Sequence, residues 1–239
     1  MPPAVSSEAF AWRSQVWRMV ESQHIAATMK LVDNRDEQDL LESLLESSKP
    51  TQPDDTAGLD YLLATPFRYD PKRDGSRFRA VTDPGVFYGA ESVRTAGAEL
   101  GYWRWKFLKD TVDLDRIEPV THTAFRVEVA TLVVDLQRPP FDADAAIWQH
   151  PTDYTLTQQF ARTAREADVG GILYQSVRDP QPSWCLALLT PAGFAKPKPH
   201  AERQTWYLTV SLHEVTLRRD TESMLVFCGG LVGRDSNVN

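Results

Sequence analysis

Two long runs of alternating apolar and polar residues constrain the fold more than any other feature of this sequence. In HTAFRVEVATLVVDL, residues 122–136, the apolar residues Phe125, Val127 and Val129 stand at every second position. A β-strand directs alternate side chains to one face, so this run predicts a long strand with one buried face. The run WYLTVSLHEVTLRR, residues 206–219, alternates in the same way and predicts a second strand.

Shorter segments add further strands and helices in no regular order. Because strand and helix do not alternate along the chain, the pattern favours an α+β fold with a mixed or largely antiparallel sheet and surrounding helices over a doubly wound parallel sheet. The expected strands are YLLATPFRY leading to Arg68 (61–69), VFYGA (86–90), GILYQSV (171–177) and WCLALL (184–189). The expected helices span residues 91–110 and run from Asp153 to about Asp168.

The N-terminal segment has a pattern that suits an amphipathic helix. Phe10, Val16 and Met19 fall roughly on one side of a helix that begins near Ser7 and runs to about Val32. Ser7 is a residue type that caps helix N-termini. We therefore expect the chain to open with a helix that packs one face on the rest of the protein.

A second helix is expected directly afterwards. Asn34 followed by Glu37 resembles a capping box, and a narrow leucine stripe within residues 40–45 is backed by acidic residues that predict a solvated face. The polar connector KPTQPDDTAG, residues 49–58, then ends the helical part. These signals predict a helical lead-in, residues 1–59, packed on a main domain, residues 60–239.

Charge and cysteine usage limit the surroundings in which the chain works. The sequence has 26 basic and 33 acidic side chains and a net charge of −7, which disfavours non-specific binding to nucleic acid or anionic lipid. Cys185 and Cys228 lie in apolar runs without metal-ligand spacing, so we expect buried thiols in a reducing compartment. With no apolar leader and no run of eighteen apolar residues, the sequence favours a cytoplasmic protein.

The common catalytic motifs are absent from the sequence. It contains no GxxxxGK[ST] phosphate loop, GxGxxG turn, GxSxG elbow or HExxH metal motif, and its five histidines are scattered, so we expect no metal site. The segment WRWKF, residues 103–107, resembles an aromatic–basic nucleic-acid contact. On a helix, however, Trp103 and Phe107 are one turn apart, which favours a core face with the basic residues outside.

A cation, an aromatic ring and a carboxylate follow one another at intervals of eleven residues: Arg77, Tyr88 and Glu99. Glu99 follows the small residues 96–98, which allow another element to approach the helix closely. Ser176 supplies a hydroxyl near the end of a strand. Taken singly, each of these side chains has an ordinary structural interpretation, as a surface cation, a strand aromatic, a helix-surface acid and a turn residue.

The segments TPFRY, SRFR, GVFYGAESVRTAGAE and VGGILYQSVRDP, taken in order, resemble the RES-domain family, which provides toxins of bacterial toxin–antitoxin pairs. The resemblance spans about residues 60–190. It implies a core like that of the ADP-ribosyltransferases and an activity that consumes NAD+ as substrate, with no separate cofactor. The loop RDPQPSWC, residues 178–185, departs from the family's glycine- and asparagine-containing turn. This departure affects the contacts that the loop would make with the phosphates of the substrate.

The resemblance also assigns roles to individual residues. Arg77, Tyr88, Glu99 and Ser176 match the family pattern and are the expected catalytic residues, with Arg68 as an additional pocket arginine. Glu99 would stabilise the oxocarbenium-like ribose that forms when nicotinamide leaves. A guanidinium such as that of Arg77, supported by Arg68, would hold the pyrophosphate bidentately. Tyr88 would stack on nicotinamide and orient the ribose, and Ser176 would bond the ribose or a phosphate.

Three functions remain open at this point. The first is cleavage of the nicotinamide–ribose bond of NAD+ by hydrolysis or phosphorolysis, which would arrest growth unless an antitoxin covers the site. The second is transfer of ADP-ribose to a macromolecule, and the third is an inactive module of the same fold that binds a partner. The resemblance further suggests a helix-turn-helix antitoxin of the Xre-like type and a dimer of toxins within the complex, with no direct contact to nucleic acid or membrane.

Overall fold

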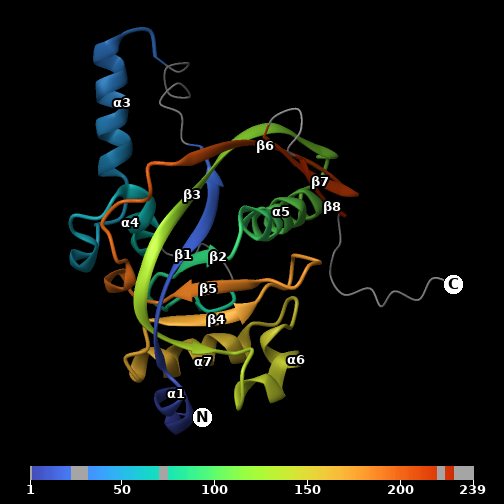
Figure 1. Cartoon of the computed structure of the whole chain (residues 1–239). Helices are drawn as coiled ribbons and strands as arrows, with labels where there is room; N and C mark the ends of the chain where they lie inside the picture. Colours follow the sequence, from blue (N-terminus) through green and yellow to red (C-terminus); the bar gives the residue numbers. More distant parts are fainter. Residues whose placement is uncertain (1, 23–31, 70–74, 220–223, 229–239) are drawn as a thin grey trace, which may run out of the picture.

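The computed structural model describes residues 2–22, 32–69, 75–219 and 224–228. It confirms the predicted α+β class, because an eight-stranded, largely antiparallel sheet is surrounded by helices (Figure 1). The likeness of this core to the ADP-ribosyltransferases stays a prediction. The strands are β1 (Phe10–Glu21), β2 (Phe87–Ala90), β3 (Arg116–Asp135), β4 (Gly171–Gln175), β5 (Trp184–Leu188), β6 (Arg203–Ser211), β7 (Glu214–Arg218) and β8 (Met224–Cys228).

Strand β3 organises the sheet. β1 pairs with it antiparallel from Phe10 opposite Val133 to Glu21 opposite His122. Along its other edge β3 pairs antiparallel with β6 and, at its end, parallel with β4. Because β1 also bridges to β2, the strands β1, β2, β5, β4 and β3 form a closed ring, from which β6, β7 and β8 extend.

Helix α5 lies between the ring and the β6–β8 extension (Figure 1). Its small residues allow this position, since a Cβ added at Gly97 would stand 2.8 Å from Leu217 Cδ1 of β7 and one at Gly101 2.8 Å from Val215 Cγ1. The close approach expected around residues 96–98 is therefore confirmed. The α-helices are α1 (Pro2–Ser7), α3 (Arg35–Ser47), α4 (Tyr61–Arg68), α5 (Val93–Asp110), α6 (Ala145–Trp148) and α7 (Thr155–Glu166), and the 3-10 helices are η1 (Asp54–Thr56), η2 (Phe141–Asp144) and η3 (Pro191–Gly193).

The helix predicted from Ser7 to Val32 is wrong. Residues 10–21 are strand β1, and residues 23–31 lie outside the described part of the chain. The apolar residues that fit a helical stripe also fit a strand with some burial on both faces. β1 has α5 on one side and a buried cluster that includes Leu63 and Phe125 on the other. The boundary between residues 59 and 60 stays a prediction.

Two other elements differ from expectation. YLLATPFR is helix α4 instead of a strand, because Asp60 caps it by accepting from the Leu62 amide at 2.9 Å and three successive residues, 62–64, are buried. The run at residues 206–219 is divided by a turn at residues 212–213 into β6 and β7. Apolar and polar residues alternate on both sides of the turn, so the alternation alone did not reveal the turn.

The remaining predicted elements are confirmed, with shifts of a few residues at their ends. Asn34 accepts from the Glu37 amide at 2.9 Å as the N-cap of α3, and α7 begins two residues after Asp153, whose carboxylate accepts from the Thr155 amide. Helix α3 stands away from the sheet (Figure 1). Its leucine stripe is largely exposed. None of the helices in the described ranges is long and apolar enough to cross a bilayer.

The aromatic residues of α5 do not form the core face that the spacing predicted. Trp103 is 43% exposed and Phe107 is 56% exposed, whereas Trp105 between them packs against the core and donates to the Leu212 carbonyl at 2.9 Å. The small residues of the first turns already fix which face of α5 is buried. Trp103 and Phe107 therefore stay largely accessible to solvent.

His122 on β3 is fully buried, and desolvation lowers the pKa of its imidazole. In the unfolded chain the pKa of histidine is about 6.5, so acid protonates the unfolded state first. The neutral, buried imidazole therefore contributes stability that is complete above that pH and is lost as the pH falls toward the lower, folded-state pKa. We expect the free energy of unfolding, measured by denaturant titration from pH 8 to pH 5, to fall on acidification.

The variant His122→Gln should weaken this dependence on pH, because it removes the buried titrating group. The same substitution at the exposed His213 is the matched control and should leave the dependence as in the wild type. An unchanged slope of stability against pH in His122→Gln would contradict the assignment.

Candidate active site

A cavity of about 230 Å³ opens between β1, β2 and the first half of α5. Three of the predicted site residues, Arg77, Tyr88 and Glu99, line it together. The cavity wall carries three arginines against a single carboxylate among the described lining residues, so it favours an anionic ligand. The lining residues are Trp17, Arg18, Met19, Ser76, Arg77, Tyr88, Gly89, Ala90, Ala96, Glu99, Leu100, Trp103, Tyr154, Tyr174, Arg178 and Cys185.

Glu99 is the single acid among the described lining residues, and α5 positions it. Ser92 caps the helix by accepting from the Thr95 amide at 3.1 Å, so Glu99 lies two turns inside a well-anchored N-terminus. The Ser176 hydroxyl donates to Glu99 Oε1 at 2.7 Å. Cys185 Sγ lies 3.9 Å from the same oxygen, and burial, followed by the Glu99 charge, raises the pKa of its thiol.

Ser176 is buried at the end of β4 and is not part of the cavity wall. Besides donating to Glu99, its oxygen accepts from the amides of Arg178 at 3.3 Å and Asp179 at 3.1 Å. The hydroxyl is thus fully used within the protein. In this geometry Ser176 is a positioning residue for Glu99, which differs from the direct ligand contact that we expected.

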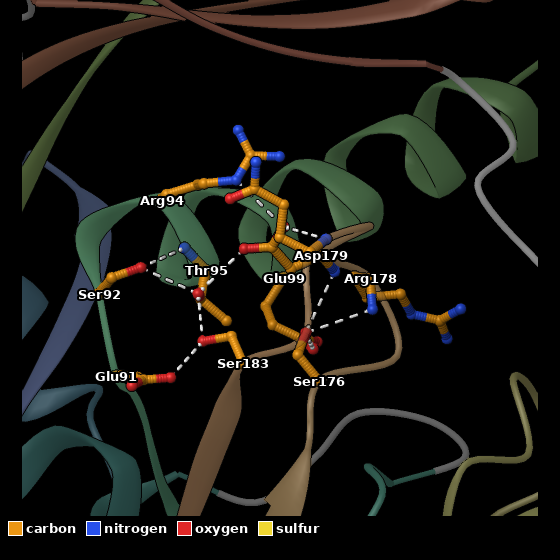
Figure 2. Close-up of polar contacts among 10 residues, drawn as sticks. Glu91, Ser92, Arg94, Thr95, Glu99, Ser176, Arg178, Asp179 and Ser183 are labelled. Carbon is orange, nitrogen blue, oxygen red and sulfur yellow. Dashed lines mark hydrogen bonds and ion pairs between the residues drawn. The ribbon is translucent and has the colours of Figure 1, made fainter.

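A polar network ties the loop after Ser176 to the start of α5 (Figure 2). Asp179, whose side chain is 1% exposed, accepts from Arg94 Nε at 3.1 Å and from the Thr95 hydroxyl at 3.0 Å. The Ser183 hydroxyl is 2.8 Å from Thr95 Oγ1 and donates to Glu91. The loop 178–185 is therefore hydrogen-bonded to α5, the same helix that carries Glu99.

Arg77 enters the cavity from the segment before β2. It is 8% exposed, and its Nη1 donates to the carbonyls of Trp148 at 2.8 Å and His150 at 2.9 Å. Its guanidinium carbon lies 4.8 Å from the ring centroid of Tyr154. Nε and Nη2 of Arg77 donate to no acceptor among the described residues, so they can donate to a ligand.

Tyr88 presents its ring to the cavity, but its hydroxyl is occupied. The hydroxyl accepts from the Phe78 amide at 2.9 Å and is 2.8 Å from Ser76 Oγ. Burial raises the pKa of this phenol, so the hydroxyl stays protonated. Tyr88 therefore holds the turn on which Arg77 stands, and the expected bond from this hydroxyl to a ribose has no support in the geometry.

Arg68 is not a pocket arginine. Its Nε donates to the Pro50 carbonyl at 2.6 Å and its Nη1 pairs with Glu46 of α3 at 2.9 Å, so it fastens α4 to the preceding segment. The prediction assumed a strand that would point Arg68 toward the site. Because α4 is a helix, the side chain leaves it in another direction.

The cavity also contains residues that were not among the predicted site residues. Arg18 of β1 donates to the Tyr88 carbonyl at 2.8 Å, and burial lowers the pKa of its guanidinium to about 10. Tyr154 and Arg178 complete the wall beside Arg77. Arg18 lies in the segment read as a helix, and only long-range contacts bring the other two residues to the site. No group of histidine, cysteine, aspartate and glutamate side chains within the described ranges is arranged to hold a metal ion.

A Ser176→Ala variant tests the positioning of Glu99. Losing the hydrogen bond leaves the carboxylate free to rotate, so we expect kcat for cleavage of NAD+, the substrate that the family resemblance implies, to fall roughly tenfold, with a smaller change in KM. Ser183→Ala alters the same network without touching Glu99 and should stay within about twofold of the wild type. Equal losses in the two variants would contradict a specific role for Ser176.

A family model for the RES domain matches residues 51–211, which is more than half of the 239 residues and includes all the predicted site residues. A structural match is the crystal structure of the M. tuberculosis MbcT–MbcA toxin–antitoxin complex, with a TM-score of 0.49 and 12% identity, covering 96% of this chain and 93% of that chain. No curated protein matches the sequence significantly. The predicted resemblance is confirmed, and the chain belongs to the RES-domain family.

Proposed function

We propose that the chain degrades NAD+ by cleaving the bond between nicotinamide and ribose. The observation that carries the proposal is Glu99, which Ser176 holds in the wall of the cavity and which is the single carboxylate among the described lining residues. The same wall carries three arginines and several aromatic rings. Such a wall suits an anionic ligand with a stacking base. The carboxylate suits a reaction in which positive charge develops on a sugar.

Glycosidic cleavage of this kind passes through an oxocarbenium-like ribose. A carboxylate beside the ribose stabilises that positive charge more in the transition state than in the substrate, which is what accelerates a reaction. Nicotinamide leaves as a neutral molecule, so its departure needs no general acid. The described residues of the cavity wall include no histidine, which is compatible with this chemistry.

The acceptor of the ADP-ribosyl group distinguishes three versions of the reaction. Water would give ADP-ribose, phosphate would give its phosphorylated form, and a macromolecule would retain the group. The purified chain should be incubated with NAD+ labelled in the ADP-ribose part, with and without phosphate, while released nicotinamide is measured. Nicotinamide release with a small labelled product supports degradation, label on a macromolecule supports transfer, and no release at high protein concentration contradicts both.

The role in the cell follows from the family. Membership of the RES-domain family supports a toxin that arrests growth by depleting NAD+ in the cytoplasm. A partner of the Xre-like helix-turn-helix type would restrain this toxin. A dimer of toxins within that complex is part of the same proposal. Expression of the chain alone should lower cellular NAD+ before growth stops, and growth arrest with unchanged NAD+ would contradict the link.

A further inference from the structure

Two arginines from distant parts of the chain are held side by side by the segment 148–154. Arg77 donates to the carbonyls of Trp148 and His150, and its guanidinium lies over the ring of Tyr154. Arg178 Nη2 donates to the Pro151 carbonyl and to the Tyr154 hydroxyl, the latter at 3.2 Å. One short segment and one tyrosine therefore bring two positive charges to the same wall of the cavity.

Neither arginine has a carboxylate partner among the described residues. Both are nevertheless buried, with Arg77 8% exposed and Arg178 4% exposed. Arg178 also packs flat on Tyr102, with its guanidinium carbon 3.4 Å from the ring centroid, and its Nη1 is buried without any acceptor within the described ranges. A buried cation is costly unless it is paired, and a buried donor without an acceptor adds to that cost. An anion bound between the two guanidinium groups would offset both costs.

We infer that Arg178, together with Arg77, binds the pyrophosphate of the dinucleotide; this inference rests on the proposed function. Two guanidinium groups present planar forks of donors that match phosphate oxygens, and two positive charges match the two negative charges of a pyrophosphate. Arg178 thus has the role that the family resemblance assigned to Arg68, which is to support Arg77 in binding the pyrophosphate. It lies in the loop where the sequence departs from the family pattern.

The position of Arg178 links this anion site to Glu99. Arg178 follows Ser176 by two residues, and its amide donates to the same hydroxyl that holds the carboxylate. A phosphate bound by Arg178 is therefore held by the same loop whose Ser176 orients Glu99. Nη1 of Arg178 is buried, so a second bond from this guanidinium to a phosphate requires a local shift of the wall.

The test compares a substrate that carries the pyrophosphate with one that lacks it. In Arg178→Met we expect kcat/KM for NAD+ to fall roughly 10–100-fold, the loss typical of removing hydrogen bonds to a charged group. For nicotinamide riboside, which has no phosphate, the change should stay within about threefold. Arg178→Lys, which keeps the charge but not the fork, should fall between the wild type and the methionine variant.

Arg68→Met is the matched control, because it makes the same substitution at an arginine outside the cavity, and it should leave both substrates unaffected. Binding of inorganic pyrophosphate, measured by calorimetry, gives a readout that needs no turnover and should weaken at least tenfold in Arg178→Met. Equal losses on NAD+ and nicotinamide riboside, or unchanged pyrophosphate binding, would overturn the inference. If the wild type releases no nicotinamide from either substrate, the proposed function fails, and the calorimetry alone decides whether the anion site exists.

Discussion

A Glu99→Gln variant is expected to fold like the wild type and to release nicotinamide from NAD+ roughly 10²–10³-fold more slowly. The amide keeps the size of the side chain, and its oxygen can still accept from the Ser176 hydroxyl, so the local structure has little reason to change. What disappears is the negative charge beside the ribose. Since this charge is used mainly in the transition state, the loss should appear in kcat with little change in KM.

The matched control is Glu91→Gln, the same substitution at an exposed glutamate eight residues earlier. Glu91 accepts from the Ser183 hydroxyl at 2.8 Å and does not line the cavity, so its variant should keep nearly full activity. Circular dichroism and thermal melting establish that both variants fold. A folded Glu99→Gln protein with wild-type turnover would remove Glu99 from the mechanism, whatever the wild type does with NAD+.

The parts of the fold that sequence predicted well are those set by local pattern. Strand β3 and the start of α3 follow from alternation and from capping, which are properties of neighbouring residues. Strand β1 was missed because its length and place depend on pairing with β3, more than one hundred residues away in the sequence. A stripe such as Phe10, Val16 and Met19 fits either period when both faces of an element carry apolar residues.

The site shows the same division between local and distant information. Arg77, Tyr88 and Glu99 belong to one stretch of chain, and their motifs placed all three at the cavity. Tyr154 and Arg178 come from separate elements and meet only through the fold. Arg178 belongs to the quoted segment VGGILYQSVRDP, but that segment did not indicate its contact with Tyr154. Their place in the cavity wall depends on contacts that a linear pattern does not contain.

An Asp179→Ala variant is expected to lower the free energy of unfolding by about 2–3 kcal/mol, because it removes the buried acceptor of Arg94 and Thr95. The expected loss lies below that for breaking a fully buried ion pair, since the Arg94 side chain is 29% exposed and water can solvate it once the partner is gone. Denaturant titration gives the change. The loop 176–183 also loses its tie to α5 (Figure 2), so turnover of NAD+ should fall with stability.

Asp179→Asn separates the charge from the shape of this side chain. Its oxygen can still accept from Arg94 and from the Gln181 amide at 3.1 Å, while its amide group can donate to Thr95 Oγ1. We expect the asparagine variant to lose roughly half of the stability that the alanine variant loses, and to keep most of the activity. If the alanine variant were as active as the wild type at a temperature where it is folded, the loop would not need this anchor to present Ser176. The orientation of Glu99 would then rest on β4 and α5 alone.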